Sequence, residues 1–299
     1  MSTFWSWFVA IGTLGTIAGC WWLIRWTAKV RPGEVPIGEP TGHTYDDRQL
    51  SEYNNPMPRW WLWMFYILIV FGLIYLLLYP GLGNWQGLLG WSQERQYEEQ
   101  MAAAEERYGP IFARYAEQPI PELAEDPEAL KVGQRLYATY CSQCHGSDAR
   151  GAIGYPNLTD DAWLYGGDPQ SIKTSILDGR NGNMPALGQA LGGDDAVDAV
   201  VQYVMSLSGQ VEAPADPAGE TKFKQVCAGC HMADGTGNPA LGAPNLTDDV
   251  WLYGGSRGAI RQTLMQGRQG RMPAHEEFLG ENKVHVLAAY VYSLSQDGQ

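Results

Sequence analysis

A chain of 299 residues is long enough for two or three domains, and this one combines only 18% charged residues with a net charge of −13. The charges of residues 1–80 balance, so the acidic excess lies entirely in the rest of the chain. This excess argues against nucleic-acid binding, and it favours either simple solubility or attraction of a positively charged partner.

Two uncharged segments near the N-terminus, residues 1–24 and 60–93, each contain an apolar stretch of about 20 residues, long enough to cross a bilayer as a helix. Trp residues lie at the edges of both stretches, as in the aromatic belts of membrane proteins. A cleaved signal peptide is the alternative for the first stretch, but it lacks a basic start and a small-residue cleavage site. We therefore expect transmembrane helices in residues 1–30 and 60–83.

The segment between these helices, residues 31–59, sets the expected topology. Arg25 and Lys29 lie at the end of the first apolar stretch, and further Arg residues follow in the segment. By the positive-inside rule this loop is cytoplasmic, so both chain termini and residues 84–299 lie on the other side of the membrane. His43 lies in this loop without an evident partner in the sequence.

Residues 84–127 have the composition of a stalk that leads away from the second apolar stretch. Their central part, residues 92–118, is rich in Glu, Ala and Arg, which predicts an exposed helix broken near Gly109-Pro110. Several prolines then mark a linker. Asp126 before Pro127 predicts the N-cap of a new helix, because Asp accepts hydrogen bonds from free amide groups and Pro suits the first turn.

The second half of the chain contains an internal repeat. The sequence PNLTDDAWLYGG at 156–167 recurs as PNLTDDVWLYGG at 244–255. Matched segments continue on the C-terminal side, GNMPA at 182–186 with GRMPA at 270–274, and VVQYVMSLS at 200–208 with LAAYVYSLS at 287–295. Such self-similarity is typical of a duplicated unit. We expect two domains, residues 128–210 and 211–299, which we name the first and the second repeat.

Each repeat begins with a helical stripe made of a Gly and an aromatic residue, Gly133 with Tyr137 and Gly219 with Phe223. Such a stripe suits close packing against another helix. Residues 168–180 and 256–268 then show a cap residue, apolar positions at helical spacing and a terminating Gly, which predicts a second helix in each repeat.

Four of the five cysteines form two CxxCH motifs, in which Cys141 and Cys144 precede His145, and Cys227 and Cys230 precede His231. This is the pattern of covalent c-type haem attachment. Cysteines three residues apart lie on one face of a helical turn, where both thiols can reach the two vinyl groups of one porphyrin, and the adjacent His can bind the iron. A zinc half-site would need more Cys or His nearby, and a redox dithiol would not need the following His.

Met184 and Met272 are the only methionines at equivalent positions of both repeats, each directly before a Pro. Because of this matched placement, we assign Met184 as the second axial ligand of the iron bound by His145, and Met272 as that of the iron bound by His231. A Met opposite a His raises the haem potential. Packing in a core is the alternative for both. His275 could compete with Met272, but the first repeat has no matching His. The remaining candidates are expected to serve packing or to lie away from iron: Met205, Met232, Met265 and His285.

With CxxCH, a downstream Pro-Asn-Leu and a Met-Pro, each repeat resembles a class I cytochrome c domain. In that family the carbonyl oxygen of the Pro accepts a hydrogen bond from the iron-binding His. The resemblance assigns this role to Pro156 and Pro244, where the contact would orient the imidazole and tune the metal.

A wider resemblance covers nearly the whole chain. Residues 54–91, followed by a charged stalk and two c domains, resemble the dihaem subunit III of cbb3-type cytochrome c oxidases, and residues 283–295 fit the same family. The resemblance implies a mainly α fold, with two transmembrane helices in a bacterial inner membrane and two tandem class I cytochrome c domains carrying two covalently bound haem c in the periplasm.

In the family this subunit takes electrons from a c-type cytochrome and passes them to a monohaem subunit and then to the haem–copper subunit, where oxygen is reduced and protons are pumped. With His and Met on both irons, the chain would hold no catalytic residue of its own. The alternatives are a dihaem subunit of another respiratory complex, such as a periplasmic dehydrogenase, and a dihaem peroxidase, which needs an open iron.

The repeated segments also supply expected haem surroundings. Aromatic residues of the repeated segment are candidates to line the porphyrin or to hydrogen-bond its propionates: Trp163, Tyr165, Trp251 and Tyr253. Arginines beside the Met-Pro segments are candidates to pair with propionates, ordinary surface placement being the alternative: Arg180, Arg268 and Arg271.

Overall fold

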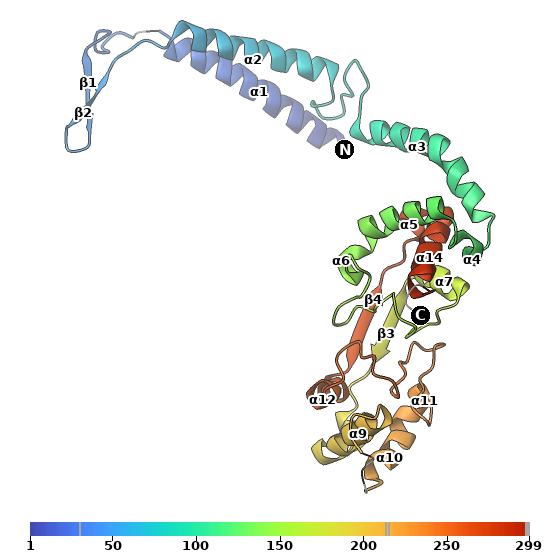
Figure 1. The fold of residues 1–299 in the computed structure, drawn as a ribbon. Helices are drawn as coiled ribbons and strands as arrows, with labels where there is room; N and C mark the ends of the chain where they lie inside the picture. The colour runs from blue at the N-terminus through green and yellow to red at the C-terminus, as the bar shows by residue number, and fades with distance from the viewer. Residues whose placement is uncertain (30, 213, 215, 297–299) are drawn as a thin grey trace. The chain divides into compact units, whose positions relative to one another are not determined.

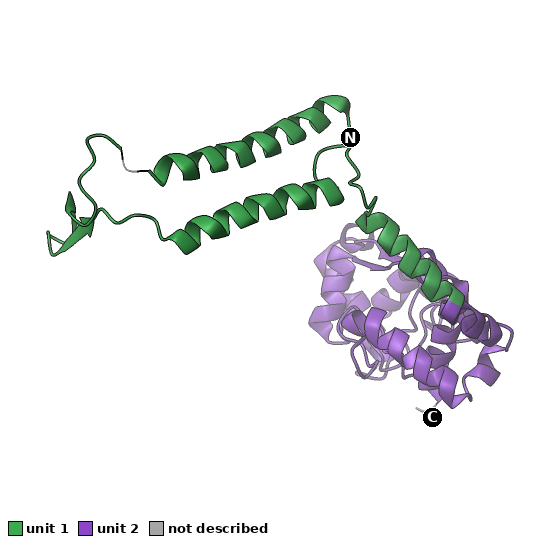
Figure 2. Cartoon of the chain, turned by 90° about the horizontal axis from the view of Figure 1, so that it is seen from above, with its two compact units in different colours: residues 1–106 green, residues 107–299 purple. Residues whose placement is uncertain are grey.

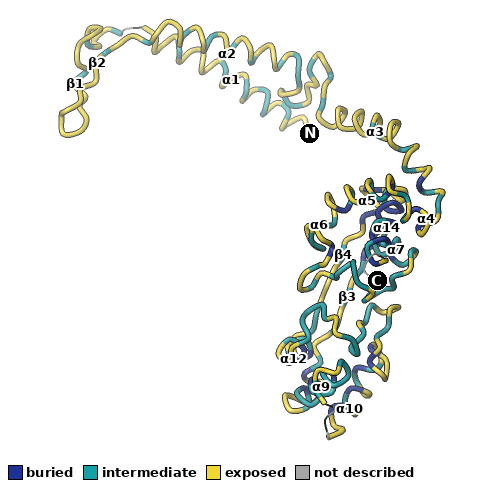
Figure 3. Tube along the Cα trace, viewed as in Figure 1, coloured by how far each residue is buried: buried dark blue, intermediate teal, exposed yellow. Residues whose placement is uncertain are grey.

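The computed structural model describes residues 1–29, 31–212, 214 and 216–296 (Figure 1). The chain forms two compact units, Met1–Glu106 and Arg107–Gln299 (Figure 2). Exposed residues dominate the first unit, whereas buried residues gather in the second (Figure 3).

The first unit contains the two apolar helices, α1 (Thr3–Thr27) and α2 (Arg59–Leu78), which lie side by side (Figure 1). Both are long and apolar enough to cross a membrane. Neither buries a side chain within the structure, so their large apolar side chains face outward along the full length, as lipid contact requires. Helix α1 lies within the predicted segment 1–30, whereas α2 begins one residue before the predicted segment 60–83 and ends inside it.

The loop between these helices carries an unpredicted hairpin of β1 (Pro40–Tyr45) and β2 (Leu50–Tyr53), which pair antiparallel. The pairing brings Glu52 to His43, with 3.4 Å between the carboxylate oxygen Oε2 and Nδ1. The sequence had left His43 without a partner; the structure supplies one because the hairpin aligns residues that are distant along the chain.

Helix α3 (Gln93–Ala116) is the predicted exposed stalk, and α4 (Ile120–Leu123) follows it. The predicted break at Gly109-Pro110 is wrong, because α3 continues through Pro110. A Pro within a helix removes one backbone hydrogen bond, and this long helix tolerates the loss. The border between the two compact units falls within α3, just before this point.

The second unit contains the repeats, built from short helices and one pair of strands. In the first repeat these are α5 (Pro127–Tyr140), α6 (Ser142–His145), α7 (Pro169–Asp178), β3 (Arg180–Met184), α8 (Gly188–Leu191) and α9 (Asp194–Leu207). In the second they are α10 (Ala218–Lys222), the π-helical turn η1 (Phe223–Cys227), α11 (Ala228–His231), α12 (Arg257–Gln266), β4 (Arg268–Met272), α13 (Glu276–Leu279) and α14 (Glu281–Gln296).

The predicted helix starts are confirmed by their caps. The Asp126 side chain accepts hydrogen bonds from two amide groups at the start of α5, and Asp168 does the same for α7. Ser256 caps α12 in the second repeat. These side chains satisfy amide groups that have no partner within the helix, so each cap fixes where its helix begins.

Each Met of the Met-Pro segments ends a strand, which the sequence analysis did not predict. β3 and β4 pair antiparallel, with Arg180 opposite Met272 and Met184 opposite Arg268. One strand comes from each repeat, so this pair joins the repeats along their backbones (Figure 1).

The buried side chains form two cores, and each core draws on both repeats. The first core contains Tyr137 and Ile172 from the first repeat together with Val284–Val291 from α14 of the second. The second core contains Val197–Val204 from α9 of the first repeat together with Phe223 and Leu264 of the second.

The segments 128–210 and 211–299, predicted as domains, therefore do not pack as separate domains within the described residues. A cut after residue 210 would divide both cores, because the closing helix of each repeat packs with the opening helix of the other. The last three residues of the predicted second domain, 297–299, lie outside the described residues.

Candidate haem centres

Each CxxCH motif lies at the end of the opening helix of its repeat. In the first repeat α5 ends at Tyr140, and the motif continues as the turn α6, with the His145 amide donating to the Cys141 carbonyl oxygen at 3.0 Å. In the second repeat η1 runs into the turn α11, which ends at His231. The helical turns place both cysteines and the His of each motif on one short segment, as haem attachment requires.

Both motif histidines use one ring nitrogen for a backbone contact. His145 Nδ1 donates to the carbonyl oxygen of Pro156 at 2.9 Å, and His231 Nδ1 donates to that of Pro244 at 3.0 Å. These are the contacts that the cytochrome c resemblance implied. Because Nδ1 carries the hydrogen, Nε2 keeps its lone pair and is available to a metal.

The surroundings of both histidines favour the neutral imidazole. Burial lowers the pKa of His145, the hydrogen bond to Pro156 partly offsets this, and nearby His275 lowers the pKa further. Burial likewise lowers the pKa of His231, against the effect of Pro244. A metal ligand must be an unprotonated imidazole, so this surrounding suits iron binding.

The first Cys of each motif is partly or fully buried, which favours its thiol form. Burial raises the pKa of Cys141 to about 11, with Cys144 adding to the shift, and Cys227 beside Cys230 has a pKa of about 11 for the same reasons. Zinc sites and redox dithiols both rely on thiolates. Across the described residues, no group of three or more His, Cys, Asp or Glu side chains is placed to hold a metal ion. Each motif thus offers two cysteines and one His on one short segment, the set that haem attachment uses.

Each of the two methionines packs against the core that contains or contacts a haem-motif cysteine of the other repeat. Met272 packs against the first core, which also contacts Cys141, and Met184 packs against the second core, which contains Cys227. The sequence had paired Met184 with His145 and Met272 with His231. The structure brings together the other combinations, because the chain passes from one core to the other through β3 and β4.

The repeated Trp residues belong to their own cores. Trp163 packs against the first core and Trp251 against the second. Each indole lies directly over the final Gly of its repeated segment, Gly167 or Gly255, where a Cβ atom would overlap the ring. The Gly-Gly ending of both segments thus makes room for the Trp that precedes it.

The predicted arginines and tyrosines form two matching pairs. The Arg180 guanidinium lies 4.7 Å from the centre of the Tyr165 ring, and that of Arg268 lies 4.7 Å from the Tyr253 ring. The hydroxyl group of Tyr165 is buried and has no hydrogen-bond partner in the structure. Arg271 is exposed, in agreement with ordinary surface placement.

Each paired arginine also has a hydrogen bond to its own repeat. Arg180 Nε donates to Ser175 Oγ and Arg268 Nε donates to Thr263 Oγ1, both at 2.9 Å. These contacts, like the cation–π contacts, were not predicted; only the matching positions of the arginines in both repeats pointed to them.

The remaining candidates take packing roles or lie at the surface. Met205 packs against the second core, as expected, and Met232 and Met265 are exposed. His285 is buried, with Nε2 2.8 Å from the carbonyl oxygen of Gln118. His275 is buried with no hydrogen-bond partner for Nδ1, at the position that Leu187 holds in the first repeat.

Family models match most of the chain. One described as the N-terminal domain of cytochrome oxidase-cbb3, FixP, matches residues 38–86, and one described as cbb3-type cytochrome c oxidase subunit III matches residues 128–204 and again 214–291. The chain belongs to the cbb3-type subunit III family. The resemblance drawn from the sequence is thus confirmed, and the double match agrees with the two CxxCH motifs.

Members of this family resemble the chain over nearly their full length. A protein of Rubrivivax gelatinosus named cbb3-type cytochrome c oxidase subunit CcoP is 44% identical, with 98% of this chain and 95% of the relative covered. A CcoP of Cereibacter sphaeroides is 40% identical, covering 89% and 97%. A FixP of Azorhizobium caulinodans is 39% identical, covering 85% and 92%.

Proposed function

We propose that this subunit III carries two covalently bound haem c groups and relays electrons within a cbb3-type oxidase. The observation that carries the proposal is the pair of matching centres, each with two cysteines, a His whose Nδ1 donates to a Pro carbonyl, and the Met of a Met-Pro segment packed against the same core. The printed names of the relatives, which are oxidase subunits, support it.

The residues present fit a haem c at each centre. Cys141 and Cys144 would form the thioether bonds of one group, and Cys227 and Cys230 those of the other. The bound haem supplies reversible one-electron oxidation and reduction of its iron. The Pro156 and Pro244 carbonyl oxygens hold the imidazoles in orientation, which keeps Nε2 directed away from the backbone contact.

The ligand set makes this chain a carrier and not a site of oxygen reduction. A His and a Met on each iron, with Met272 and Met184 as the candidates of the two cores, would leave no coordination position for oxygen or peroxide. The partners we propose are a c-type cytochrome as electron donor, and the monohaem and haem–copper subunits as acceptors. This arrangement disfavours the peroxidase alternative, which needs an open iron.

We also infer the topology of the anchor. α1 and α2 cross the bacterial inner membrane, residues 31–59 face the cytoplasm, and both termini with the haem centres face the periplasm. The support is the apolar exposed surface of both helices and the location of Arg25 and Lys29 beside the loop.

Pyridine haemochrome spectra of the gently solubilised complex test the proposal. The isolated chain should contain two haem c groups, and the intact complex should contain b-type haem and copper as well. An intact complex without b-type haem and copper would instead support a subunit of another respiratory complex. A chain with one haem c or none would contradict the relay.

A further inference from the structure

After each Met, the backbone runs alongside the second helix of the other repeat. The Leu187 amide, three residues after Met184, donates to the Leu264 carbonyl oxygen of α12 at 2.8 Å. The His275 amide, three residues after Met272, donates to the Ile176 carbonyl oxygen of α7 at 3.1 Å. These are equivalent hydrogen bonds, and both join one repeat to the other.

The Gly that ends each second helix makes this crossing possible. Gly179 and Gly267 have φ values of 70° and 74°, in the region that favours glycine. A Cβ atom at Gly179 would overlap the backbone of Met272 and its neighbours, and one at Gly267 would overlap the backbone of Met184 and its neighbours. Each Gly therefore admits the Met-Pro segment of the other repeat.

The closing helices are exchanged in the same way. Gly133 of α5 lies against Tyr290 of α14, and the rings of Tyr137 and Tyr290 are 5.6 Å apart. In the second core Gly219 of α10 lies against the backbone of α9. The Gly-plus-aromatic stripes predicted from the sequence thus pack against helices as expected, but the helices come from the opposite repeat.

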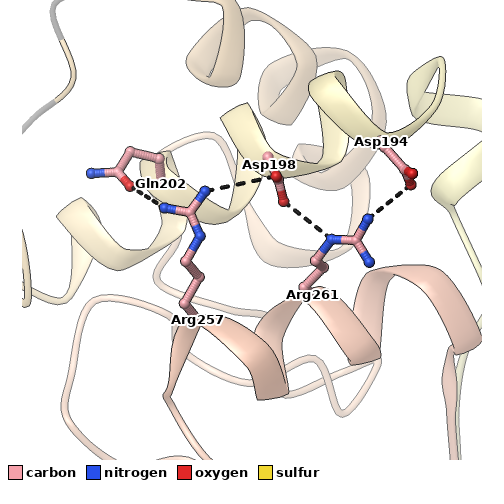
Figure 4. Close-up of polar contacts among 5 residues, drawn as sticks. All are labelled: Asp194, Asp198, Gln202, Arg257 and Arg261. Atoms are coloured by element: carbon pink, nitrogen blue, oxygen red, sulfur yellow. Dashed lines mark hydrogen bonds and ion pairs between the residues drawn. The ribbon is translucent and has the colours of Figure 1, made fainter.

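Ion pairs at the surface also join helices of different repeats. Lys173 Nζ of α7 lies 2.7 Å from Glu281 Oε1 of α14. Around the second core, Arg261 of α12 contacts Asp194 at 2.8 Å and Asp198 at 3.2 Å, both on α9 (Figure 4). Arg257 of α12 reaches the same helix through Gln202 at 3.2 Å (Figure 4). Each contact joins the second helix of one repeat to the closing helix of the other.

We propose that the axial ligands are crossed between the repeats, so that Met272 completes the iron site of His145 and Met184 completes that of His231. The proposal rests on the proposed two-haem function. Each repeat then supplies the attachment site and the His of one haem and the Met of the other. Ligation within a repeat would require β3 and β4 to separate and both closing helices to change partners.

The decisive test removes one haem and asks which Met the other one uses. In the full chain, Cys141→Ala with Cys144→Ala prevents attachment of the first haem and leaves the second. In this background Met184→Ala should abolish the methionine–iron charge-transfer band of the ferric haem and lower its midpoint potential. Met272→Ala should leave both unchanged, and Met205→Ala, which alters a packing Met of the same core, serves as the control for loss of volume.

The reciprocal background, Cys227→Ala with Cys230→Ala, guards against a disturbed core in the first. There the effects should be inverted, with Met272→Ala abolishing the band and Met184→Ala sparing it. If each Met instead affects the haem of its own repeat, the crossing is overturned. If neither affects either haem, Met ligation itself is overturned. The haem count of the unaltered chain remains a separate measure of the two-haem function.

A measurement that keeps both haems tests the exchange of helices. Lys173→Glu and Glu281→Lys should each lower the thermal midpoint of the solubilised chain, and the double variant should recover part of the loss, because the pair of charges is restored. Lys224→Glu with Glu220→Lys, a pair within one short segment of the second repeat, is the matched control for charge reversal. No recovery in the Lys173–Glu281 double variant would contradict the exchanged packing.

Discussion

Met232 holds a backbone conformation that its counterpart in the first repeat leaves to glycine. Its φ of 65° and ψ of 160° nearly equal the 80° and 157° of Gly146, which also follows the His of a CxxCH motif. Only glycine adopts this region freely, and another residue there costs about 1–3 kcal/mol. The side chain of Met232 is 47% exposed, so little packing offsets this cost.

Met232→Gly should therefore stabilise the chain. We expect the free energy of unfolding to rise by about 1 kcal/mol, since the relief of strain exceeds the extra entropy that Gly loses on folding. The apparent thermal midpoint of the solubilised haem-loaded chain measures the effect. Met265→Gly, which alters an exposed Met within α12, should lower the midpoint and is the control; an equal fall in both variants would contradict the strain at Met232.

Tyr137 supports the loop that follows the first CxxCH motif. Its hydroxyl group donates to the Gly146 carbonyl oxygen at 2.7 Å, and Phe223 replaces it in the second repeat. Tyr137→Phe should lower the free energy of unfolding by about 1 kcal/mol, because it leaves that carbonyl without its partner. Thermal unfolding with Tyr140→Phe, an exposed neighbour, as control measures the loss.

The same hydroxyl makes the chain sensitive to alkali. Burial raises the pKa of Tyr137 above its usual 10.0, with smaller effects of Cys141, Tyr290 and Asp148. The folded state thus favours the protonated phenol, whose contribution to stability is present below pH 10 and declines as pH rises above it. Between pH 8 and about 11, the free energy of unfolding should decrease less steeply with pH for Tyr137→Phe than for the unaltered chain. Equal slopes of the two pH profiles would contradict this.

Among contacts of single residues, the sequence analysis predicted those that a nearby motif indicates. The His145–Pro156 and His231–Pro244 contacts were implied by the resemblance of each repeat to a cytochrome c domain, which rests on the CxxCH motif and the Pro-Asn-Leu that follows it. The pairing of Arg180 with Tyr165 was not predicted, because nothing in the local sequence indicates which ring a guanidinium will cover. The fold brings the two residues together.

Among the elements, the ends of α7 and α12 place the strictest demand on residue type. Gly267→Ala would need a Cβ atom where the Met184 backbone passes, at a φ of 74° and a ψ of −179°. We expect a loss of about 2 kcal/mol or more in the free energy of unfolding, together with a fall in the potential of the haem bound by His231. Redox titration and thermal unfolding of the solubilised chain measure the two effects.

Gly258→Ala is the matched control in the same helix. A Cβ atom at Gly258 meets nothing within 4 Å, and Ala favours a helix, so this variant should be neutral or slightly more stable. If Gly267→Ala changes the free energy of unfolding and the haem potential no more than Gly258→Ala does, the Met-Pro segment does not pass close to Gly267.

Helix starts could be predicted from the sequence, whereas strands could not. The caps of α5, α7 and α12 depend on residues next to the helix, and Asp126, Asp168 and Ser256 identify them. The strands β3 and β4 read RNGNM and RQGRM, which are rich in Gly, Asn and Arg and poor in residues that favour strands. They pair because each strand crosses from one repeat to the other. Nothing in the local sequence of either strand indicates this crossing.

For the whole molecule, duplication itself hides the exchange of helices. Both repeats present a Gly-plus-aromatic stripe and a closing helix of nearly the same sequence, so either closing helix satisfies either stripe. Helical periodicity by itself does not distinguish the two arrangements. The strands β3 and β4 cross between the repeats, and each closing helix packs with the opening helix of the other repeat, an arrangement that the sequence analysis did not predict.

The topology of the anchor leads to a prediction about accessibility. Tyr45 on the hairpin and Tyr97 on α3 are 59% and 62% exposed, so a thiol at either position can react with a maleimide. With Cys20→Ala as background, the haem cysteines are consumed by thioether bonds. In intact spheroplasts, a membrane-impermeant maleimide should label Tyr97→Cys at once and Tyr45→Cys only after permeabilisation. In the proposed topology the positively charged end of α1 keeps the hairpin in the cytoplasm, and α3 follows α2 on the periplasmic side. Labelling of both variants before permeabilisation would mean that the hairpin does not lie in the cytoplasm, and the reverse order would invert the inferred topology.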